Sequence, residues 1–491
     1  MNSCSNTRLI WIKMTMAVMA AVIVMAGCAT VGPDYQAPPL DAPSDWRNAK
    51  NGGLTEKKPT PLELAHWWTK LNDPVLSGLI ERAASSNLDV KEAIARVNES
   101  RARLGISRAS YFPTLTGSAS GTVSRSSENT GSGHENESYS TALDASWEID
   151  LFGGVRRSVE SSTASLQANE ANLNDVMVTL LADVALSYID VRTYQSRLIT
   201  AQANLKAQEE TYELTKARYE AGLTDELTVQ QARYNLESTR SGIPTLRSGL
   251  EASLNRLAVL LGQSPGALHD ELADYKPVPV PPTEVAVGVP ADSLRRRPDI
   301  RKAERTLAAQ NAQIGVATAD LYPKLTLGGS IGIDALTSGG LFNAANHSYS
   351  YGPRLTWAIF QAGSIRRNIA AQTAIKDQYL YQYESAVLTA LEDVENALTK
   401  FAQEQDRRKS LVEAASAAEK AVTLAQDKFQ AGLVDFSVVL DAQRSLLSFQ
   451  DQLAQSDGAV TADLVSLYKA LGGGWTPMSE SSETIKKDKQ S

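Results

Sequence analysis

Two segments of the sequence match Gly-x-Ser-x-Gly, the pattern that presents a nucleophilic serine in many hydrolases. They span residues 262–266 and 328–332. A nucleophile elbow needs a strand that leads into a helix, but the first segment follows a predicted helix and the second lies inside a predicted strand. We therefore predict no catalytic residue, and we expect that the protein is not an enzyme.

Metal ligands and reactive thiols are also sparse. Four histidines are scattered along the chain, at His66, His134, His269 and His347. The only cysteines are Cys4 and Cys28, both close to the N-terminus, so the rest of the chain has no disulfide and no cysteine-based metal site. The net charge of −8, from 48 basic and 56 acidic residues, argues against nucleic-acid binding. We expect no metal and no bound cofactor.

The segment 1–27 has the pattern of an export signal. Arg8 and Lys13 precede an apolar run from Met14 to Ala26, which is too short to span a bilayer. The run ends in small residues directly before Cys28 and resembles a bacterial lipobox. This resemblance implies that Cys28 becomes the first mature residue and carries N-acyl (palmitate) and S-diacylglycerol lipid. An ordinary signal peptide with a buried cysteine is the alternative.

The remaining chain contains one pattern twice, and the residue numbers of the two copies differ by a constant 210. The matching pairs include Gly105 and Gly315, Pro113 and Pro323, Trp147 and Trp357, Arg157 and Arg367, Gly222 and Gly432, and Gly262 and Gly472. No net insertion separates the two copies. We predict a duplicated fold with these boundaries: signal peptide 1–27, lipid-anchored extended segment 28–60, repeat 1 61–274, proline-rich linker 275–290, repeat 2 291–474 and polar tail 475–491.

Each repeat contains a pair of strands, at about 114–150 and 324–360. From Leu115 to Val123 the odd positions are apolar or glycine, and the even positions are serine or threonine. This period of two, over about ten residues, is typical of a membrane β-barrel with a lipid-facing and a lumen-facing side. A soluble β-sandwich, whose apolar face packs on a core, is the alternative.

Aromatic residues gather where these strands meet the helices, as in an interfacial belt. They are Tyr111, Phe112 and Trp147 in the first copy, and Tyr322, Trp357 and Phe360 in the second. Four strands cannot close a barrel, and an open sheet edge is not tolerated in lipid. The chain must therefore form an oligomer.

Two helical segments are much longer than those of ordinary globular proteins. Residues 155–221 and 365–431 contain no glycine or proline, and each would extend about 100 Å as a helix. In the first segment Val184, Val191 and Leu198 begin a seven-residue apolar series that continues to Tyr219, which predicts coiled-coil packing. Gly222 and Gly432 follow the helices and predict tight turns into returning helices, the first of which Pro244 should kink. A coiled-coil scaffold alone would explain these helices equally well.

Together these features resemble the outer-membrane efflux lipoproteins of the TolC and OprM type. The resemblance covers the signal and lipobox, the segment 31–35, both hairpins and the segment 147–153. It implies an α+β membrane protein: a trimer whose twelve strands form a barrel in the bacterial outer membrane and whose twelve helices form a periplasmic tunnel. It also implies a periplasmic membrane-fusion adaptor and an inner-membrane transporter of the resistance-nodulation-division class as partners.

The resemblance further assigns residues to the channel. Asp441 falls where the family places a pore-facing aspartate, and Asp225, Asp435 and Phe429 are further candidates for the constriction. Phe429 replaces the family's gate tyrosine, and Thr228 replaces the aspartate that this tyrosine reaches, so that hydrogen bond cannot form. Gly222, Leu223, Gly432 and Leu433 form the hairpin tips and are the predicted adaptor contacts.

Three functions remain open on the sequence alone. The first is a passive outer-membrane exit duct for drugs or other toxic small molecules, which takes its energy from a partner. The second is an exit duct for proteins or peptides. The third is an envelope tether without a pore.

Overall fold

The computed structural model describes residues 30–39, 42–47, 54–55, 57, 60–282 and 285–475. Cys28 and the predicted signal peptide lie outside the described residues, as does the polar tail from residue 476. The described chain divides into two compact units, each of which takes segments from both repeats. Unit 1 contains Arg96–Glu170, Lys302–Glu384 and the described residues before Pro39, and unit 2 contains the remaining segments.

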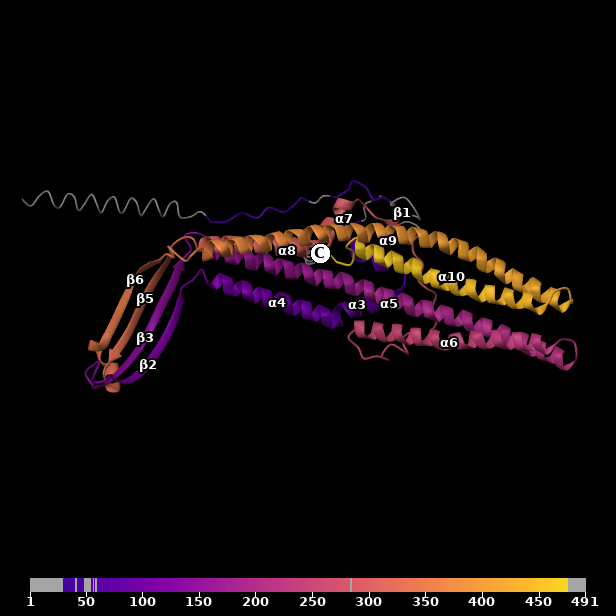
Figure 1. The fold of residues 1–491 in the computed structure, drawn as a ribbon, viewed down its shortest axis with the longest axis horizontal. Coiled ribbons are helices and arrows are strands. Elements are labelled where there is room, and N and C mark those ends of the chain that lie inside the picture. The colour runs from indigo at the N-terminus through magenta and orange to yellow at the C-terminus, as the bar shows by residue number, and fades with distance from the viewer. Residues whose placement is uncertain are drawn as a thin grey trace, which may run out of the picture. The chain divides into compact units, whose positions relative to one another are not determined.

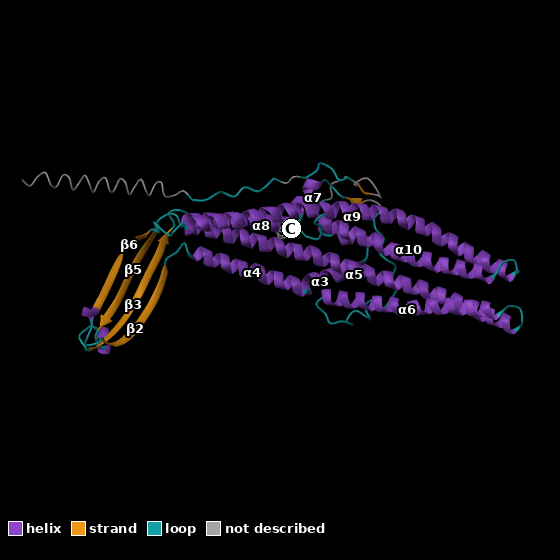
Figure 2. Cartoon of the chain, viewed as in Figure 1, coloured by secondary structure: helices purple, strands orange, loops and turns teal. Residues whose placement is uncertain are grey.

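Each repeat has a helix of 22 residues, then two long strands, a helix of 67 residues and a helix of 35 residues, in the same order in both (Figures 1 and 2). Repeat 1 and the segment before it contain β1 (Leu54–Thr55), α2 (Pro61–Ala65), η1 (Trp67–Leu71), α3 (Pro74–Ser86), α4 (Leu88–Ala109), β2 (Thr114–Arg125), β3 (Glu135–Ile149), α5 (Gly154–Glu220) and α6 (Glu226–Leu260). The linker and repeat 2 contain β4 (Val285–Ala286), α7 (Pro290–Arg296), α8 (Pro298–Ala319), β5 (Lys324–Ala335), η2 (Ser338–Phe342), η3 (Ala344–Asn346), β6 (His347–Thr356), α9 (Ser364–Gln430) and α10 (Phe436–Ala470).

Four antiparallel strands in unit 1 form one sheet in the order β2-β3-β5-β6, and Figure 1 shows them side by side. Thr114 pairs with Ser146 in the first hairpin, and Lys324 pairs with Thr356 in the second. β5 spans the positions equivalent to β2, and β6 lies within those equivalent to β3, with the same residue pairs opposite each other. The repeat seen in the sequence is therefore also a repeat of hydrogen-bond register. The predicted strand pairs are confirmed.

One face of this sheet is apolar and exposed in the single chain. Leu115 is 71%, Leu143 50%, Ile331 62% and Leu355 65% exposed. The opposite face carries hydroxyl and carboxylate groups: Ser120 and Ser140 are hydrogen-bonded at 2.9 Å, and Ser348 Oγ donates to Asp334 Oδ2 at 2.7 Å. Because the described elements leave these four side chains uncovered, the sheet is not half of a sandwich in this chain.

The predicted aromatic belt has the same anchoring contact in both copies. The indole N–H of Trp147 donates to the carbonyl of Tyr111, and that of Trp357 donates to the carbonyl of Leu321, both at 3.0 Å. An indole with its apolar ring exposed and its N–H satisfied suits the boundary between lipid and water.

Helix α8 packs on the first turns of α5 within unit 1. Gln313 Nε2 donates to Ser161 Oγ at 2.8 Å, and Ala164 packs with Ala308 and Ala309. This is the contact between repeat 1 and repeat 2 on the helical side of unit 1.

Unit 2 contains the turns that join α5 to α6 and α9 to α10. Val184 and Val191 are fully buried and Leu198 is 9% exposed, but the same heptad series ends at Tyr219, which is 43% exposed. The predicted seam is therefore confirmed in its first half and is wrong at its end. Helix α6 continues through Pro244, and the kink predicted there stays a prediction.

The core of unit 2 lies away from the turns. It joins Leu76 and Leu79 of α3, Tyr188 of α5, Phe401 of α9 and Leu464 of α10, all less than 2% exposed. The proline-rich linker packs on this core, because Thr461 donates to the carbonyl of Pro279 at 2.8 Å. None of the helices in the described part of the chain is long and apolar enough to cross a membrane.

Candidate functional site: hairpin tips and the N-terminal clamp

The two helical turns have the geometry that the sequence predicts. Gly222 and Gly432 have φ values of +73° and +71°, in the left-handed region that glycine adopts without a Cβ penalty. In each turn the following leucine N–H reaches back to a helix carbonyl, from Leu223 to Arg218 at 2.8 Å and from Leu433 to Lys428 at 2.9 Å. Leu223 is 68% and Leu433 74% exposed, so both tips present an apolar side chain to the outside.

The helices that follow the two tips begin differently. Asp225 caps α6: its Oδ1 accepts from the backbone N–H of Thr228 at 2.9 Å and from the Thr228 hydroxyl at 2.6 Å. Asp435 occupies the same position before α10 but has no side-chain capping bond. The hydrogen bonds from Thr228 hold the pKa of the Asp225 carboxyl below its ordinary value.

Phe429 is half-buried inside the tip region of its own chain. Its ring lies 5.2 Å from the ring of Phe436, centroid to centroid, and the Arg218 guanidinium carbon lies 4.8 Å from its centroid. A cation over an aromatic face is attracted by the ring quadrupole. Phe429 therefore links α9 to α10 and to α5 without the hydroxyl that the family's tyrosine would supply.

A buried polar network lies further along the same helices and was missed by the sequence analysis. Gln443 Nε2 donates to Thr211 Oγ1 at 3.0 Å, and Arg444 Nε donates to Asn235 Oδ1 at 3.2 Å. Asn235 and Gln443 are only 3% and 5% exposed. The sequence does contain a signal for this network: Asn235 and Gln443 are polar residues at positions of the long helices that face a neighbouring helix.

The remaining candidates for the constriction are not brought together in the single chain. Asp441 is exposed on α10, one residue after the buried Leu440, and Asp225 and Asp435 are exposed at the starts of two different helices. Their roles in a pore stay predictions.

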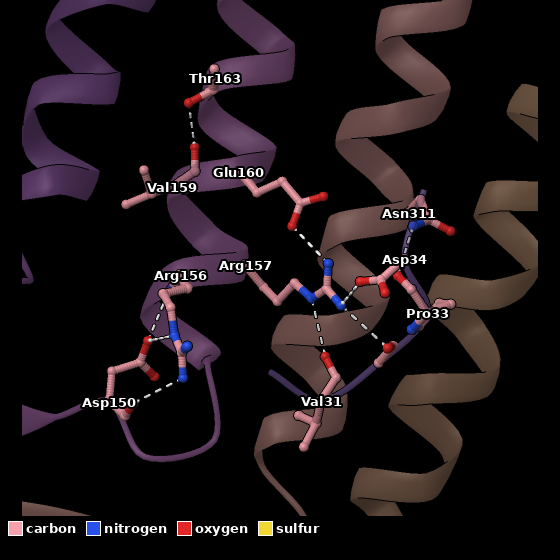
Figure 3. Close-up of polar contacts among 11 residues, drawn as sticks. Val31, Pro33, Asp34, Asp150, Arg156, Arg157, Val159, Glu160, Thr163 and Asn311 are labelled. Carbon is pink, nitrogen blue, oxygen red and sulfur yellow. Dashed lines mark hydrogen bonds and ion pairs between the residues drawn. The ribbon is translucent and has the colours of Figure 1, made fainter. Parts of the chain in front are cut away.

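The segment that follows Cys28 is held tightly on α5 and α8 within unit 1 (Figure 3). Arg157 of α5 points at this segment: its guanidinium donates to the carbonyls of Val31 at 3.1 Å and Gly32 at 3.3 Å, and to Asp34 Oδ1 at 2.7 Å. From α8, Asn311 donates to the carbonyl of Pro33 at 2.9 Å. We call these contacts the N-terminal clamp.

The Arg157 side chain is only 4% exposed, so its charge needs partners. Asp34 and Glu160 supply two carboxylates, at 2.7 and 2.8 Å. Gly315 of α8 makes room for the arginine, since a Cβ there would lie 2.6 Å from Arg157 Cγ. The clamp is therefore built from the N-terminal segment, repeat 1 and repeat 2 together.

The comparisons with known proteins agree with this architecture. The sequence matches the family model "Outer membrane efflux protein" twice, over residues 79–263 and 289–473. The chain belongs to the outer membrane efflux protein family. The two matches begin and end at equivalent positions of the two repeats, as the sequence predicts, and members of this family are efflux channels of the outer membrane.

Several relatives resemble the chain over nearly its whole length. It is 36% identical to nodulation protein T of Rhizobium leguminosarum bv. trifolii, over 93% of this chain and 97% of that protein. It is 32% identical to the solvent efflux pump outer membrane protein SrpC of Pseudomonas putida, over 93% and 98%.

Solved structures give the same result. The outer-membrane channel OprN superposes with a TM-score of 0.86 at 36% identity, covering 91% of this chain and all of that one. The open state of the MtrE outer membrane channel of Neisseria gonorrhoeae gives a TM-score of 0.80 at 29% identity, covering 91% and 99%.

Neither Gly-x-Ser-x-Gly segment forms a nucleophile elbow in this member of the efflux family. Gly262 follows α6 with a φ of +66°, and residues 328–332 lie within β5. Among the residues that the structure describes, no group of three or more histidine, cysteine or acidic side chains is placed to hold a metal ion.

The clamp predicts a specific effect on proteolysis. Arg157→Ala should expose the N-terminal segment, because the Arg157 side chain donates three hydrogen bonds to that segment. We expect chymotrypsin to cut after Tyr35 several-fold faster in the purified variant. Arg156→Ala is the matched control, since Arg156 bonds to Asp150 and not to the segment. Equal cutting rates in both variants would mean that the clamp does not hold the segment.

The unequal caps predict unequal effects of the same substitution. Asp225→Ala should accelerate hydrogen exchange at the start of α6, because the Thr228 N–H loses its acceptor, whereas Asp435→Ala should leave α10 unchanged. Because the pKa of Asp225 is lowered on folding, its stabilising contribution is present above the ordinary carboxyl pKa. It should disappear as the pH falls through the lower, folded value. If Asp225→Ala and Asp435→Ala accelerate hydrogen exchange at the following helix equally, the two aspartates do not differ as caps.

Proposed function

We propose that three copies of this chain form the outer-membrane exit duct of a tripartite efflux system, a passive conduit for toxic small molecules. The observation that carries the proposal is the four-stranded sheet, which has an apolar exposed face and a polar face, and whose outer strands β2 and β6 each have a partner strand on one side only. In lipid these edges need partners, because unpaired backbone groups there are costly. Three copies would supply twelve strands, enough to close a barrel around a lumen.

Apolar or amphiphilic compounds are the proposed cargo. Three relatives from Pseudomonas putida support this choice: SrpC is a solvent efflux protein, and TtgI and ArpC are toluene and antibiotic efflux proteins, at 32% and 31% identity. A channel carries no energy source of its own, so the transport energy comes from an inner-membrane transporter. A transporter of the resistance-nodulation-division class fits this role.

The hairpin tips are the proposed contact for a periplasmic adaptor. Gly222 with Leu223, and Gly432 with Leu433, form two matching turns whose leucines are largely exposed. Exposed apolar side chains on a hydrogen-bonded turn are suited to insertion between helices of a partner. Lipid on Cys28 would anchor the chain shortly before the clamp begins at Val31.

The direct test of the efflux function is a toxicity panel of solvents, dyes, detergents and antibiotics on a deletion strain, with and without the gene restored. Restored tolerance to several unrelated compounds supports the proposal. Unchanged tolerance together with altered secretion of proteins would favour protein export instead. Absence of any conductance by the purified protein in a planar bilayer would favour a tether.

Asp441 is the proposed selectivity residue of the duct. Three copies of this exposed carboxylate on one ring would attract cations and repel anions. We expect Asp441→Asn to shift the reversal potential in a potassium chloride gradient toward zero, and Asp435→Asn to shift it less. If the reversal potential of Asp441→Asn equals that of the unaltered protein, Asp441 does not line the throat.

A further inference from the structure

The connections from β3 to α5 and from β6 to α9 occupy equivalent positions of the two repeats, but they differ in charge. The connection in repeat 1 contains two carboxylates, Glu148 and Asp150. The equivalent residues of repeat 2 are Ala358 and Phe360. The arginines in the first turn of the following helix are present in both repeats. Repeat 2 thus keeps the cations and lacks the carboxylates.

In repeat 1 one of these carboxylates neutralises an arginine (Figure 3). Asp150 Oδ2 accepts from the backbone N–H of Arg156 at 2.8 Å and from its Nε at 3.4 Å. The other oxygen, Oδ1, accepts from the backbone N–H of Val155 at 3.1 Å. Arg156 therefore has its ion-pair partner six positions earlier in the same connection, and not on α8.

Arg366 is the equivalent residue in α9, and its charge is not compensated. Its side chain is exposed, and its guanidinium has neither an ion pair nor a hydrogen bond with any residue that the structure describes. Phe360 stands where Asp150 stands in repeat 1 and offers no acceptor. Because Arg156 is paired within its own connection, the equivalence of the repeats assigns Arg366 no partner on a neighbouring copy either.

The connection that leaves Arg366 unpaired also exposes large apolar side chains. Phe360 is 86% and Ile359 80% exposed. They directly follow the aromatic belt, in which the amphipathic ring of Trp357 suits the boundary between lipid and water. The apolar lipid-facing side of the sheet is thus continued by these two residues up to the start of α9.

Arg366 begins close to this boundary. Two hydrogen-bonded turns fold the connection, from the N–H of Ile359 to the carbonyl of Trp357 at 3.1 Å and from the N–H of Ser364 to the carbonyl of Gln361 at 3.0 Å. Arg366 is the third residue of α9, about 3 Å along the helix axis from its start. The headgroup layer of one leaflet is roughly 5–7 Å thick, and arginine side chains extend along apolar surfaces to place their charge in such a layer.

We propose that Arg366 binds the phosphate of a phospholipid in the leaflet that faces the periplasm, with Ile359 and Phe360 among the acyl chains. A guanidinium donates two parallel hydrogen bonds to phosphate oxygens, and an amphiphile with a phosphate between its headgroup and its acyl chains matches both parts of the surface. Each copy has one such site, after β6, and none after β3, where Asp150 already pairs with the arginine. The proposal goes beyond the efflux function and depends only on the outer-membrane location of the family.

Thermal stabilisation of the purified protein in detergent tests this site. Phosphatidylglycerol, a diacylglycerol with the same acyl chains, and inorganic phosphate are added separately. We expect phosphatidylglycerol alone to raise the unfolding temperature, and Arg366→Gln to reduce this shift by at least half. Arg156→Gln is the matched control and should keep the shift, because Asp150 already pairs with its charge. An equal shift by diacylglycerol or by inorganic phosphate would overturn the proposal in favour of acyl-chain binding or of a free-anion site.

Exchange of residues between the repeats gives a second test. Phe360→Asp supplies the carboxylate of repeat 1, so Arg366 should pair within the chain and the shift with phosphatidylglycerol should fall as in Arg366→Gln. Phe360→Asn has the same shape without the charge and should keep most of the shift. Asp150→Phe frees Arg156 and should enlarge it. The proposal is wrong if Arg366→Gln keeps the full shift, or if Arg156→Gln loses as much of it. The unfolding temperature without lipid separates loss of the site from loss of the fold.

Discussion

The backbone groups along the outer edges of β2 and β6 have no partner strand within the chain. β2 and β6 each have one partner strand in the chain, and the face they share is apolar and uncovered. Water could satisfy such edges, but a lipid environment cannot. An outer-membrane protein with this sheet must therefore close it with other copies, and the closure forms the lumen. The channel is a consequence of satisfying the backbone rather than a site built by particular side chains.

Duplication makes this closure simple. The two repeats have the same hairpin register and the same contact from a tryptophan N–H to a backbone carbonyl. The two halves of the sheet are therefore structurally equivalent. The two outer strands, β2 and β6, belong to the equivalent hairpins of the two repeats, so each copy has one edge from each repeat left to pair. Symmetric assemblies are constrained in this way because every copy must present both halves of each interface.

Much of this fold was predictable from the sequence because its signals are local. The period of two between residues 115 and 123 depends only on alternating side-chain direction, and Gly222 and Gly432 depend only on the backbone angles of a turn. The features that were missed join residues far apart in the sequence. Arg157 and Asp34 are 123 positions apart, and Gln443 and Thr211 are 232 apart. Their types are visible in the sequence, but which helix lies opposite is decided by the fold.

The two repeats differ at several equivalent residues, and some of these differences follow from features that the chain has only once. Each chain has a single N-terminal segment, so Arg157 is buried by it while its equivalent Arg367 stays exposed. The partner residues follow the same division: Glu160 pairs with Arg157, and the equivalent position in repeat 2 is Ala370, which has no charge to offer. At the tips, Asp225 is committed to capping α6 whereas Asp435 keeps its carboxylate free of a capping bond. The two repeats thus share their long elements, and they differ in whether the arginine holds the N-terminal segment and in whether the helix after the tip has a side-chain cap.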